Sequence, residues 1–194
     1  MITTFCASRL SPGIGARGAG AFMTGKILAS FAGSAAIVAI LSIGSAPAQA
    51  REVVAFRDNA AAGTIIIKTN ERRLYYVLGD GRAIRYPVGV GKPGKQWAGH
   101  TSIDGKYLHP DWSPPSDVKH DIPSIPNVIR GGAPNNPMGV AAMTLSGGQY
   151  AIHGTNRPGS VGGFVSYGCI RMYNQDISDL FGRVSVGTPV LVTR

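Results

Sequence analysis

Short runs of β-branched and alternating apolar residues dominate the chain after residue 62. Residues 63–68 (Gly-Thr-Ile-Ile-Ile-Lys) and 73–78 each predict a β-strand. Residues 79–81, Gly-Asp-Gly, predict a tight turn, because Gly and Asp tolerate the backbone angles that hairpins need. The chain then returns as a third strand over 82–90, so this part is expected to form a β-meander.

The second half predicts another hairpin, one helix and a final strand. Apolar runs over 140–145 and 149–153 flank Gly147-Gly148. Asn174 is expected to cap a helix, with Asp176 in its first turn. The apolar face of this helix, at helical spacing, comprises Ile177, Leu180, Phe181 and Val184. With a strand over 190–192, the predicted fold is mostly β, a sandwich or barrel, with one short helix.

Residues 91–137 lack any hydrophobic period and are rich in Gly, Pro and Asp. A long irregular segment inside a compact domain is usually functional or disordered. The aromatic residues Trp97, Tyr107 and Trp112 argue against disorder. We therefore expect a lid or substrate-binding segment with short strands, with the two tryptophans packed beneath it or touching substrate.

The first 50 residues have the layout of a secretory signal peptide. They carry basic but no acidic residues, then an apolar run over 27–43, and then Ala46-Pro47-Ala48-Gln49-Ala50. This order predicts cleavage between Ala50 and Arg51, and export to the periplasm or cell envelope. An uncleaved membrane anchor is the alternative, although the run is slightly short for a span. In either case the chain would meet the membrane only through this segment.

A second methionine, Met23, begins a shorter basic region and is a possible true start of translation. Residues 51–62 are expected to be a loose lead-in to a single domain over 63–194. After residue 50 the chain has 16 basic and 10 acidic side chains, a formal charge of +6. An exported basic protein is suited to an anionic cell envelope. No stripe of basic residues with interleaved aromatics is present, so nucleic-acid binding is not expected.

Cysteine usage singles out one residue. Cys6 precedes the apolar run and would be removed with it, which leaves Cys169 as the only thiol of the mature protein. An unpaired cysteine in an exported protein is either bridged to another molecule or a free reactive thiol. Composition alone leaves a buried inert cysteine equally open.

Cys169 and His153 lie in the two segments that could carry chemistry, 166–172 and 150–155. A free thiol is only a few per cent ionised near pH 7, and a neighbouring imidazole can take its proton. Gly168 permits a turn that points amide groups at an oxyanion. A lone cysteine and a lone histidine would be weak evidence, since a structural histidine on a strand is common.

These segments resemble the L,D-transpeptidase catalytic domain of the YkuD type. The resemblance rests on His153-Gly154-Thr155 and on Ser166-Tyr167-Gly168-Cys169-Ile170-Arg171. It covers most of residues 63–193, and further matches are at 112–115, 131–132, 136–139, 174, 176 and 187–190. Many family members have histidine where this chain has Tyr167, which puts substrate preference in doubt more than catalysis.

The resemblance implies a role for each residue of the site. Cys169 would attack the carbonyl between the third-position diamino acid and the terminal D-alanine of a peptidoglycan stem tetrapeptide. His153 would take the thiol proton, and the Gly154 carbonyl would orient the imidazole. Backbone amides of Gly168 and Cys169, with Tyr167 as a further candidate, would hold the oxyanion.

Four other residues are candidates for substrate contact: Ser166, Arg171, Thr155 and Arg130. Ser166 and Arg171 would shape the loop or hold a substrate carboxylate, since guanidinium groups match carboxylates well. Arg157, like Arg130, flanks a glycine-rich segment and is a weaker candidate. No metal or cofactor is expected, because the histidines lack metal-ligand spacing and the chain after residue 50 has no second cysteine.

Three functions remain open from the sequence. The first is a transpeptidase that forms 3-3 cross-links or attaches an outer-membrane protein or lipoprotein to the wall. The second is a carboxypeptidase or endopeptidase, in which water attacks the same acyl-enzyme. The third is a non-enzymatic wall-binding module. The Cys-His pair cannot separate the first two, because they differ only in the acceptor.

Overall fold

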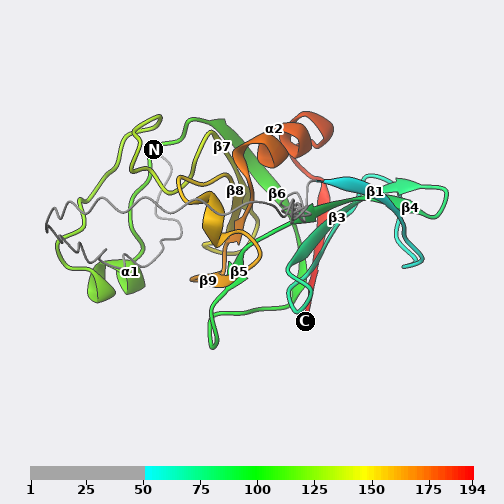
Figure 1. Cartoon of the computed structure of the whole chain (residues 1–194), viewed down its shortest axis with the longest axis horizontal. Coiled ribbons are helices and arrows are strands. Elements are labelled where there is room, and N and C mark those ends of the chain that lie inside the picture. The colour runs from blue at the N-terminus through cyan, green and yellow to red at the C-terminus, as the bar shows by residue number, and fades with distance from the viewer. Residues whose placement is uncertain (1–50) are drawn as a thin grey trace, which may run out of the picture. The chain divides into compact units, whose positions relative to one another are not determined.

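The computed structural model describes residues 51–194 (Figure 1). The expected signal peptide, the alternative start at Met23 and Cys6 lie outside the described residues. Within 51–194, no helix is both long and apolar enough to span a membrane.

Eleven strands and two α-helices make up the described part. The strands are β1 (Glu52–Ala55), β2 (Ile65–Lys68), β3 (Arg73–Gly79), β4 (Arg82–Pro87), β5 (Val90–Gly91), β6 (Gly99–Leu108), β7 (Ala141–Leu145), β8 (Ala151–His153), β9 (Phe164–Ser166), β10 (Ile170–Arg171) and β11 (Pro189–Thr193). The helices are α1 (Ser116–Asp121), α2 (Asn174–Arg183) and a 3₁₀ turn, η1 (Pro158–Ser160). The prediction of a mostly β fold is therefore confirmed.

Nine strands share one hydrogen-bonded sheet in the order β1-β4-β3-β2-β11-β6-β7-β8-β10. Strand β6 joins its two halves, because Gly99–Ser102 pairs with β11 and Ile103–Leu108 pairs with β7. The register shifts between Ile103 and Gly105, where the chain passes from one partner to the other. Strands β5 and β9 form a separate parallel pair, which lies beside β8 in Figure 1.

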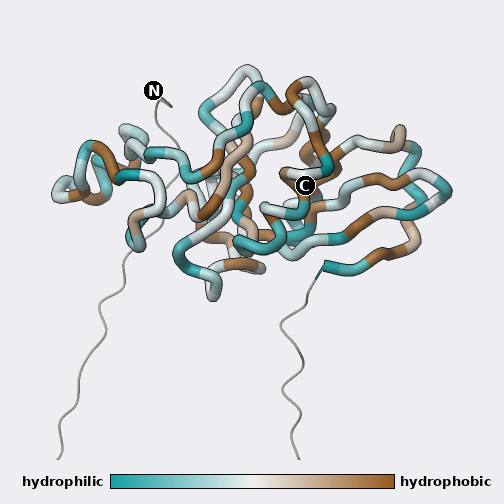
Figure 2. Tube along the Cα trace, turned by 90° about the horizontal axis from the view of Figure 1, so that it is seen from above, coloured by the Kyte–Doolittle hydropathy of each residue, from teal (hydrophilic) through white to brown (hydrophobic). Residues whose placement is uncertain are grey.

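The main core lies between the two halves of this sheet and helix α2. Strands β2, β3, β4, β7 and β11 contribute buried side chains to it, and Ile177 and Leu180 are buried from α2. Figure 2 shows hydrophobic residues along the strands and hydrophilic residues at many of the turns. The helical face predicted from Ile177, Leu180, Phe181 and Val184 is thus the face that packs on the core.

The loose lead-in predicted for residues 51–62 contains an ordered edge strand. Strand β1 pairs antiparallel with β4, with Glu52 opposite Arg85, and the two side chains form an ion pair. Three of its four residues are exposed, so the segment lacks the buried alternation by which strands are recognised.

Two further boundaries differ from the prediction. The segment 91–137, expected to be irregular, contains the ten-residue strand β6 and helix α1. Strand β6 carries few apolar residues. Its position is determined by hydrogen bonding to β11 and β7 rather than by a buried apolar face. The strand predicted over 82–90 stops at Pro87, and β5 then turns to pair with β9.

Asp176 is a buried carboxylate in the first turn of α2, with Arg51 3.5 Å away as its ion-pair partner. Burial raises the pKa of Asp176, and the charge of Arg51 offsets part of that rise. A raised pKa in the folded state means that stability is fully present below the unfolded value and is lost as pH rises through the folded value.

We therefore predict that Asp176→Asn increases the free energy of unfolding at pH 7 by about 1 kcal/mol. The difference from the parent shrinks toward pH 4, because the parent carboxylate becomes protonated there. Urea unfolding at both pH values measures it, with Asp80→Asn in the exposed β3–β4 turn as the control. An equal or larger gain at pH 4 would contradict the prediction.

Candidate active site

Parallel pairing of two strand ends places the cysteine and histidine together. Strand β10 pairs with β8 so that Ile170 lies opposite Ile152 and Arg171 opposite His153. Successive side chains in a strand point to opposite faces. Ile152 and Ile170 belong to the main core, whereas Cys169 packs with Ala151 in a separate buried cluster. The side chains of Cys169, Arg171 and His153 therefore share the other face.

His153 is fully buried, and its orientation is fixed by its own chain neighbour. Its Nδ1 lies 2.6 Å from the carbonyl oxygen of Gly154. A carbonyl can only accept, so Nδ1 carries the proton and Nε2 keeps its lone pair. Nε2 has no hydrogen-bond partner among the described residues. The imidazole is thus held in the tautomer that a general base requires.

Cys169 immediately precedes β10, is 1% exposed and is in no disulfide. It lines a cavity of about 320 Å³ between the β7–β8 turn and helix α1. The walls include Lys95, Asp117, Tyr150 and Tyr167. Cys169 therefore borders a recess that could admit an extended peptide.

Gly168 holds the turn before Cys169 in a conformation that only glycine readily adopts. Its φ is +121°, and a Cβ atom here would lie 2.3 Å from the ring of Tyr150. The indole of Trp97 donates a hydrogen bond to the Gly168 carbonyl at 2.9 Å and stacks on Tyr150, with ring centroids 4.8 Å apart. The two aromatic rings thereby press against the loop that carries the thiol.

The Ser166 side chain makes two hydrogen bonds within the same loop. Its fully buried hydroxyl donates to the Cys169 carbonyl at 2.6 Å and accepts from the Gly168 amide at 3.1 Å. These contacts favour the loop-shaping role of Ser166 over substrate contact. The Gly168 amide would have to leave Ser166 to bind an oxyanion, which places the amides of Cys169 and Tyr167 first among the candidates.

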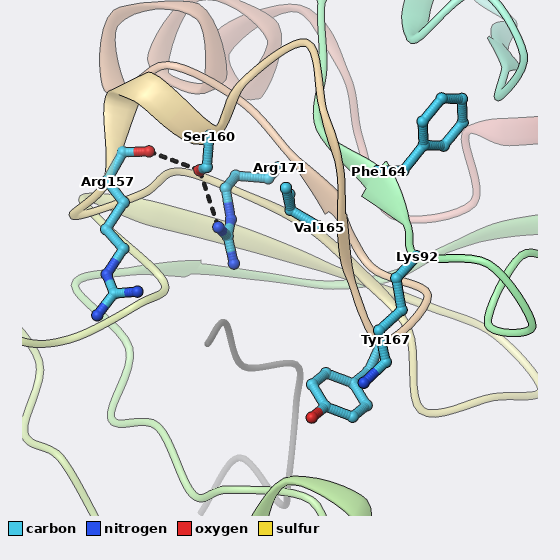
Figure 3. A pocket seen from close by; sticks show the side chains of 7 residues that line it. All are labelled: Lys92, Arg157, Ser160, Phe164, Val165, Tyr167 and Arg171. Carbon is cyan, nitrogen blue, oxygen red and sulfur yellow. Dashed lines mark hydrogen bonds between the residues drawn. The ribbon is translucent and has the colours of Figure 1, made fainter. Parts of the chain in front are cut away.

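Arg171 is buried on the same face and held on both sides. Its backbone exchanges two 2.8 Å hydrogen bonds with Gly89, and its Nη1 donates to the hydroxyl of Ser160 at 2.8 Å (Figure 3). The contact with Ser160 fixes the guanidinium group of a residue that is two positions from Cys169 in the chain.

The other predicted substrate residues are placed differently. Thr155 is buried, and its hydroxyl accepts from the Arg157 amide at 2.9 Å, so it shapes the loop after His153. Arg130 is largely exposed, pairs with Asp111 at 2.6 Å and lines neither the Cys169 cavity nor the Arg171 cavity. The structure does not bring Arg130 to the thiol.

A hydrogen bond and two ion pairs connect helix α1 with residues near the Cys169 cavity. The Tyr167 hydroxyl donates to Asp121, Lys92 lies 3.5 Å from the same carboxylate, and Lys95 pairs with Asp117. The hydrogen bond from Tyr167 lowers the pKa of Asp121, while burial and this carboxylate raise the pKa of Tyr167. Tyr167 thus links α1 to the loop that carries the thiol.

The Asn174 side chain makes contacts other than the predicted helix cap. Helix α2 begins at Asn174 with Tyr173 as its N-cap residue and no side-chain cap, so the capping prediction is wrong. The Asn174 Oδ1 instead accepts from the amide of Thr155 at 2.9 Å and of Val140 at 3.4 Å. Asn174 therefore secures the chain just after His153 and Gly154.

We predict that Asn174→Ala lowers the free energy of unfolding by about 1–2 kcal/mol, because the Thr155 amide loses its acceptor. The neighbouring exposed residue gives a control, Gln175→Ala, which should change stability by less than about 0.5 kcal/mol. Thermal and urea unfolding of the two variants measure the difference. Equal stability of both would mean that the contact contributes nothing.

Sequence reasoning missed Lys92, Lys95 and the α1 carboxylates. Their positions depend on β6, α1 and β5, which carry no periodic signal. Trp97 was expected beneath a lid or touching substrate, and its indole contacts the Gly168 carbonyl next to Cys169. Among residues 51–194, no three His, Cys, Asp or Glu side chains lie close enough to hold a metal ion.

The fold and the paired strand ends define a β-rich domain with a buried cysteine–histidine site. The sequence model of the YkuD family, the L,D-transpeptidase catalytic domain, matches residues 62–192. The chain therefore belongs to the L,D-transpeptidase family, and the resemblance inferred from its motifs is confirmed.

Curated relatives agree with this assignment. The "Probable L,D-transpeptidase YbiS" of Escherichia coli K12 is 39% identical over 141 residues, which is 69% of this chain and 45% of that protein. "Probable L,D-transpeptidase ErfK/SrfK" of the same strain is 37% identical over 66% of this chain and 43% of its own length. The chain thus spans less than half the length of these two relatives.

Solved structures share the fold. An L,D-transpeptidase from Mycobacterium smegmatis superposes with a TM-score of 0.54 at 21% identity, over 68% of this chain and 58% of its own. L,D-transpeptidase 3 from Mycobacterium tuberculosis, in complex with a faropenem-derived adduct, gives 0.53 at 15% identity, over 68% and 60%. At these identities the comparison establishes the fold alone.

Proposed function

We propose that the protein is an exported peptidoglycan L,D-transpeptidase in which Cys169 is the nucleophile and His153 the general base. The observation that supports the proposal is the placement of both side chains on one face of the paired strands β8 and β10, with Cys169 lining an open recess. The family to which the chain belongs supports the class of reaction.

In the proposed acylation step, His153 Nε2 takes the thiol proton as Sγ forms a bond to the carbonyl carbon of the third-position diamino acid. Backbone amides near Cys169 stabilise the resulting oxyanion. The carbon–nitrogen bond then breaks, His153 returns the proton to the leaving nitrogen, and D-alanine departs. The product is a thioester on Cys169.

Transfer reverses these roles. An amine of a second stem peptide, or of an outer-membrane protein or lipoprotein, attacks the thioester and gives its proton to His153. The thiolate of Cys169 leaves and regains a proton from the imidazole. The recess beside Cys169 is open, so an acceptor can approach the thioester from the side of the β7–β8 turn.

Product analysis by mass spectrometry tests the proposal. The purified protein is mixed with a disaccharide-tetrapeptide, beside a Cys169→Ala control. Cross-linked dimer with loss of D-alanine, absent from the control, is the expected result. Tripeptide without dimer would instead make the protein a carboxypeptidase. Unchanged tetrapeptide and no acyl adduct on Cys169 would contradict the enzymatic assignment.

A further inference from the structure

The recess beside Cys169 carries one cation and one anion on its walls. Among the residues of the described part that line it, the charged ones are Lys95 and Asp117, and these two form an ion pair with each other. Their side chains are 39% and 53% exposed. An ion pair exposed to this degree contributes little to stability, so a charged ligand can exchange with either partner at small cost.

A Pro-Gly turn fixes the backbone of Lys95 at the edge of the recess. The Lys95 amide donates to the Lys92 carbonyl at 2.9 Å across Pro93 and Gly94, and Gly94 has a φ of +79°. Proline followed by a glycine of positive φ is the pattern of a type II turn. The Lys92 amide in turn donates to the Ser166 carbonyl at 2.8 Å, at the end of β9. Only the side chain of Lys95 therefore has to move for it to change partners.

Asp117 is positioned by the residue that follows it. Val118 is fully buried and belongs to the same hydrophobic cluster as Cys169. The Val118 carbonyl also accepts from the amide of Ile122 at 2.8 Å, which closes the end of α1. Burial of Val118 thus holds the helix against the site, while the exposed carboxylate of Asp117 lines the recess.

The charges of this pair match those of an acceptor that reaches the thioester. The acceptor must bring an amine, and an alkyl amine is protonated in water near pH 7. A carboxylate on the wall attracts that ammonium group. Where the amine belongs to an α-amino acid group, the same carbon also carries a carboxylate, which favours a cation beside it. Lys95 and Asp117 supply the two opposite charges together.

We propose that Lys95 and Asp117 recognise the acceptor, a stem-peptide diamino acid whose side chain ends in an ammonium and a carboxylate on one carbon. In the free protein, the Lys95 ammonium occupies the place at Asp117 that the acceptor ammonium takes. On binding, Asp117 contacts the acceptor ammonium and Lys95 turns to the carboxylate. The ammonium loses a proton to water, and the free amine then attacks the thioester. This inference rests on the proposed function and names the acceptor group for the same site.

Product ratios from a two-substrate reaction test the pair. The donor is a tetrapeptide with an acetylated side-chain amine, so it cannot serve as acceptor. The acceptor is a tripeptide that ends in the diamino acid, with its side-chain carboxylate either free or amidated. Mass spectrometry gives the ratio of cross-linked dimer to hydrolysed donor. Both products come from one thioester, so the ratio does not depend on how fast each variant is acylated.

Asp117→Asn should lower the ratio of dimer to hydrolysed donor about fivefold, because the acceptor ammonium loses its ion-pair partner. In the parent, amidation of the acceptor carboxylate should lower the ratio about threefold, and in Lys95→Gln this difference should vanish. The controls are Asp80→Asn in the β3–β4 turn and Lys119→Gln on α1, two exposed residues that do not line the recess. Both controls should keep the parental ratios.

Two kinds of negative result have different meanings. A parental ratio in Asp117→Asn, or an undiminished carboxylate preference in Lys95→Gln, would overturn the recognition pair and leave the transpeptidase function standing. Hydrolysed donor without dimer in the parent, with either acceptor, would contradict the proposed function and remove the basis of this inference with it.

Discussion

Replacing His153 with glutamine is expected to slow acylation of Cys169 by at least about 100-fold at pH 7. Glutamine keeps a side chain of similar length but cannot accept the thiol proton. The variant thiol must then ionise without a base, so its acylation rate should rise steadily with pH over the range measured. Stopped-flow measurement with a carbapenem from pH 6 to 9 gives both the rate and the profile.

A histidine outside the site provides the control for this experiment. His100 lies on β6 and is exposed, so His100→Gln should acylate at the parental rate and with the parental profile. A His153→Gln variant that reacts as fast as the parent at pH 7 would remove His153 from the role of base. Its buried position and its contact with Gly154 would then be structural only.

Gly168→Ala is expected to lower the free energy of unfolding by about 2–4 kcal/mol. It should also lower the rate of acylation of Cys169 by at least about 100-fold. A methyl group at this position meets the Tyr150 ring at 2.3 Å, and alanine rarely adopts a φ of +121°. The ring cannot withdraw freely, because Trp97 stacks on it and also holds the Gly168 carbonyl. The loop must therefore move, and Cys169 moves with it.

Gly182 supplies the matched substitution, because it lies in α2 and a Cβ there meets nothing within 4 Å. Gly182→Ala should stabilise the protein by about 0.5–1 kcal/mol and leave acylation unchanged. Urea unfolding and carbapenem acylation of both variants measure the contrast. Parental stability and activity in Gly168→Ala would show that the loop adjusts at no cost.

Some residues of this site could be predicted from the sequence and others could not. The residues proposed to carry the chemistry, His153 and Cys169, lie in two short segments, so motif and spacing were enough to select them as candidates. The helix was predicted from the periodic apolar face that includes Ile177 and Leu180, because that face is buried as expected. These signals lie in short stretches of sequence, so they can be recognised without knowledge of the fold.

Residues that depend on long-range pairing escaped prediction. Strand β6 is held by hydrogen bonds to β11 and β7, so Gly99–Leu108 needs little apolar pattern of its own. Asn174 is a residue type that often caps helices, yet its side-chain carbonyl accepts from the amide of Thr155, 19 residues away in the sequence. Lys92 donates a hydrogen bond to the Ser166 carbonyl because β5 pairs with β9.

The most direct test of the central claim is the intact mass of the protein after mixing with a carbapenem, followed by peptide mapping. A β-lactam imitates the acyl donor, so a nucleophilic Cys169 should form one covalent adduct per chain. We predict a single adduct mapped to Cys169 in the parent and none in Cys169→Ala. An adduct on another residue, or no adduct in the parent, would contradict the assignment of Cys169 as the acyl-accepting nucleophile.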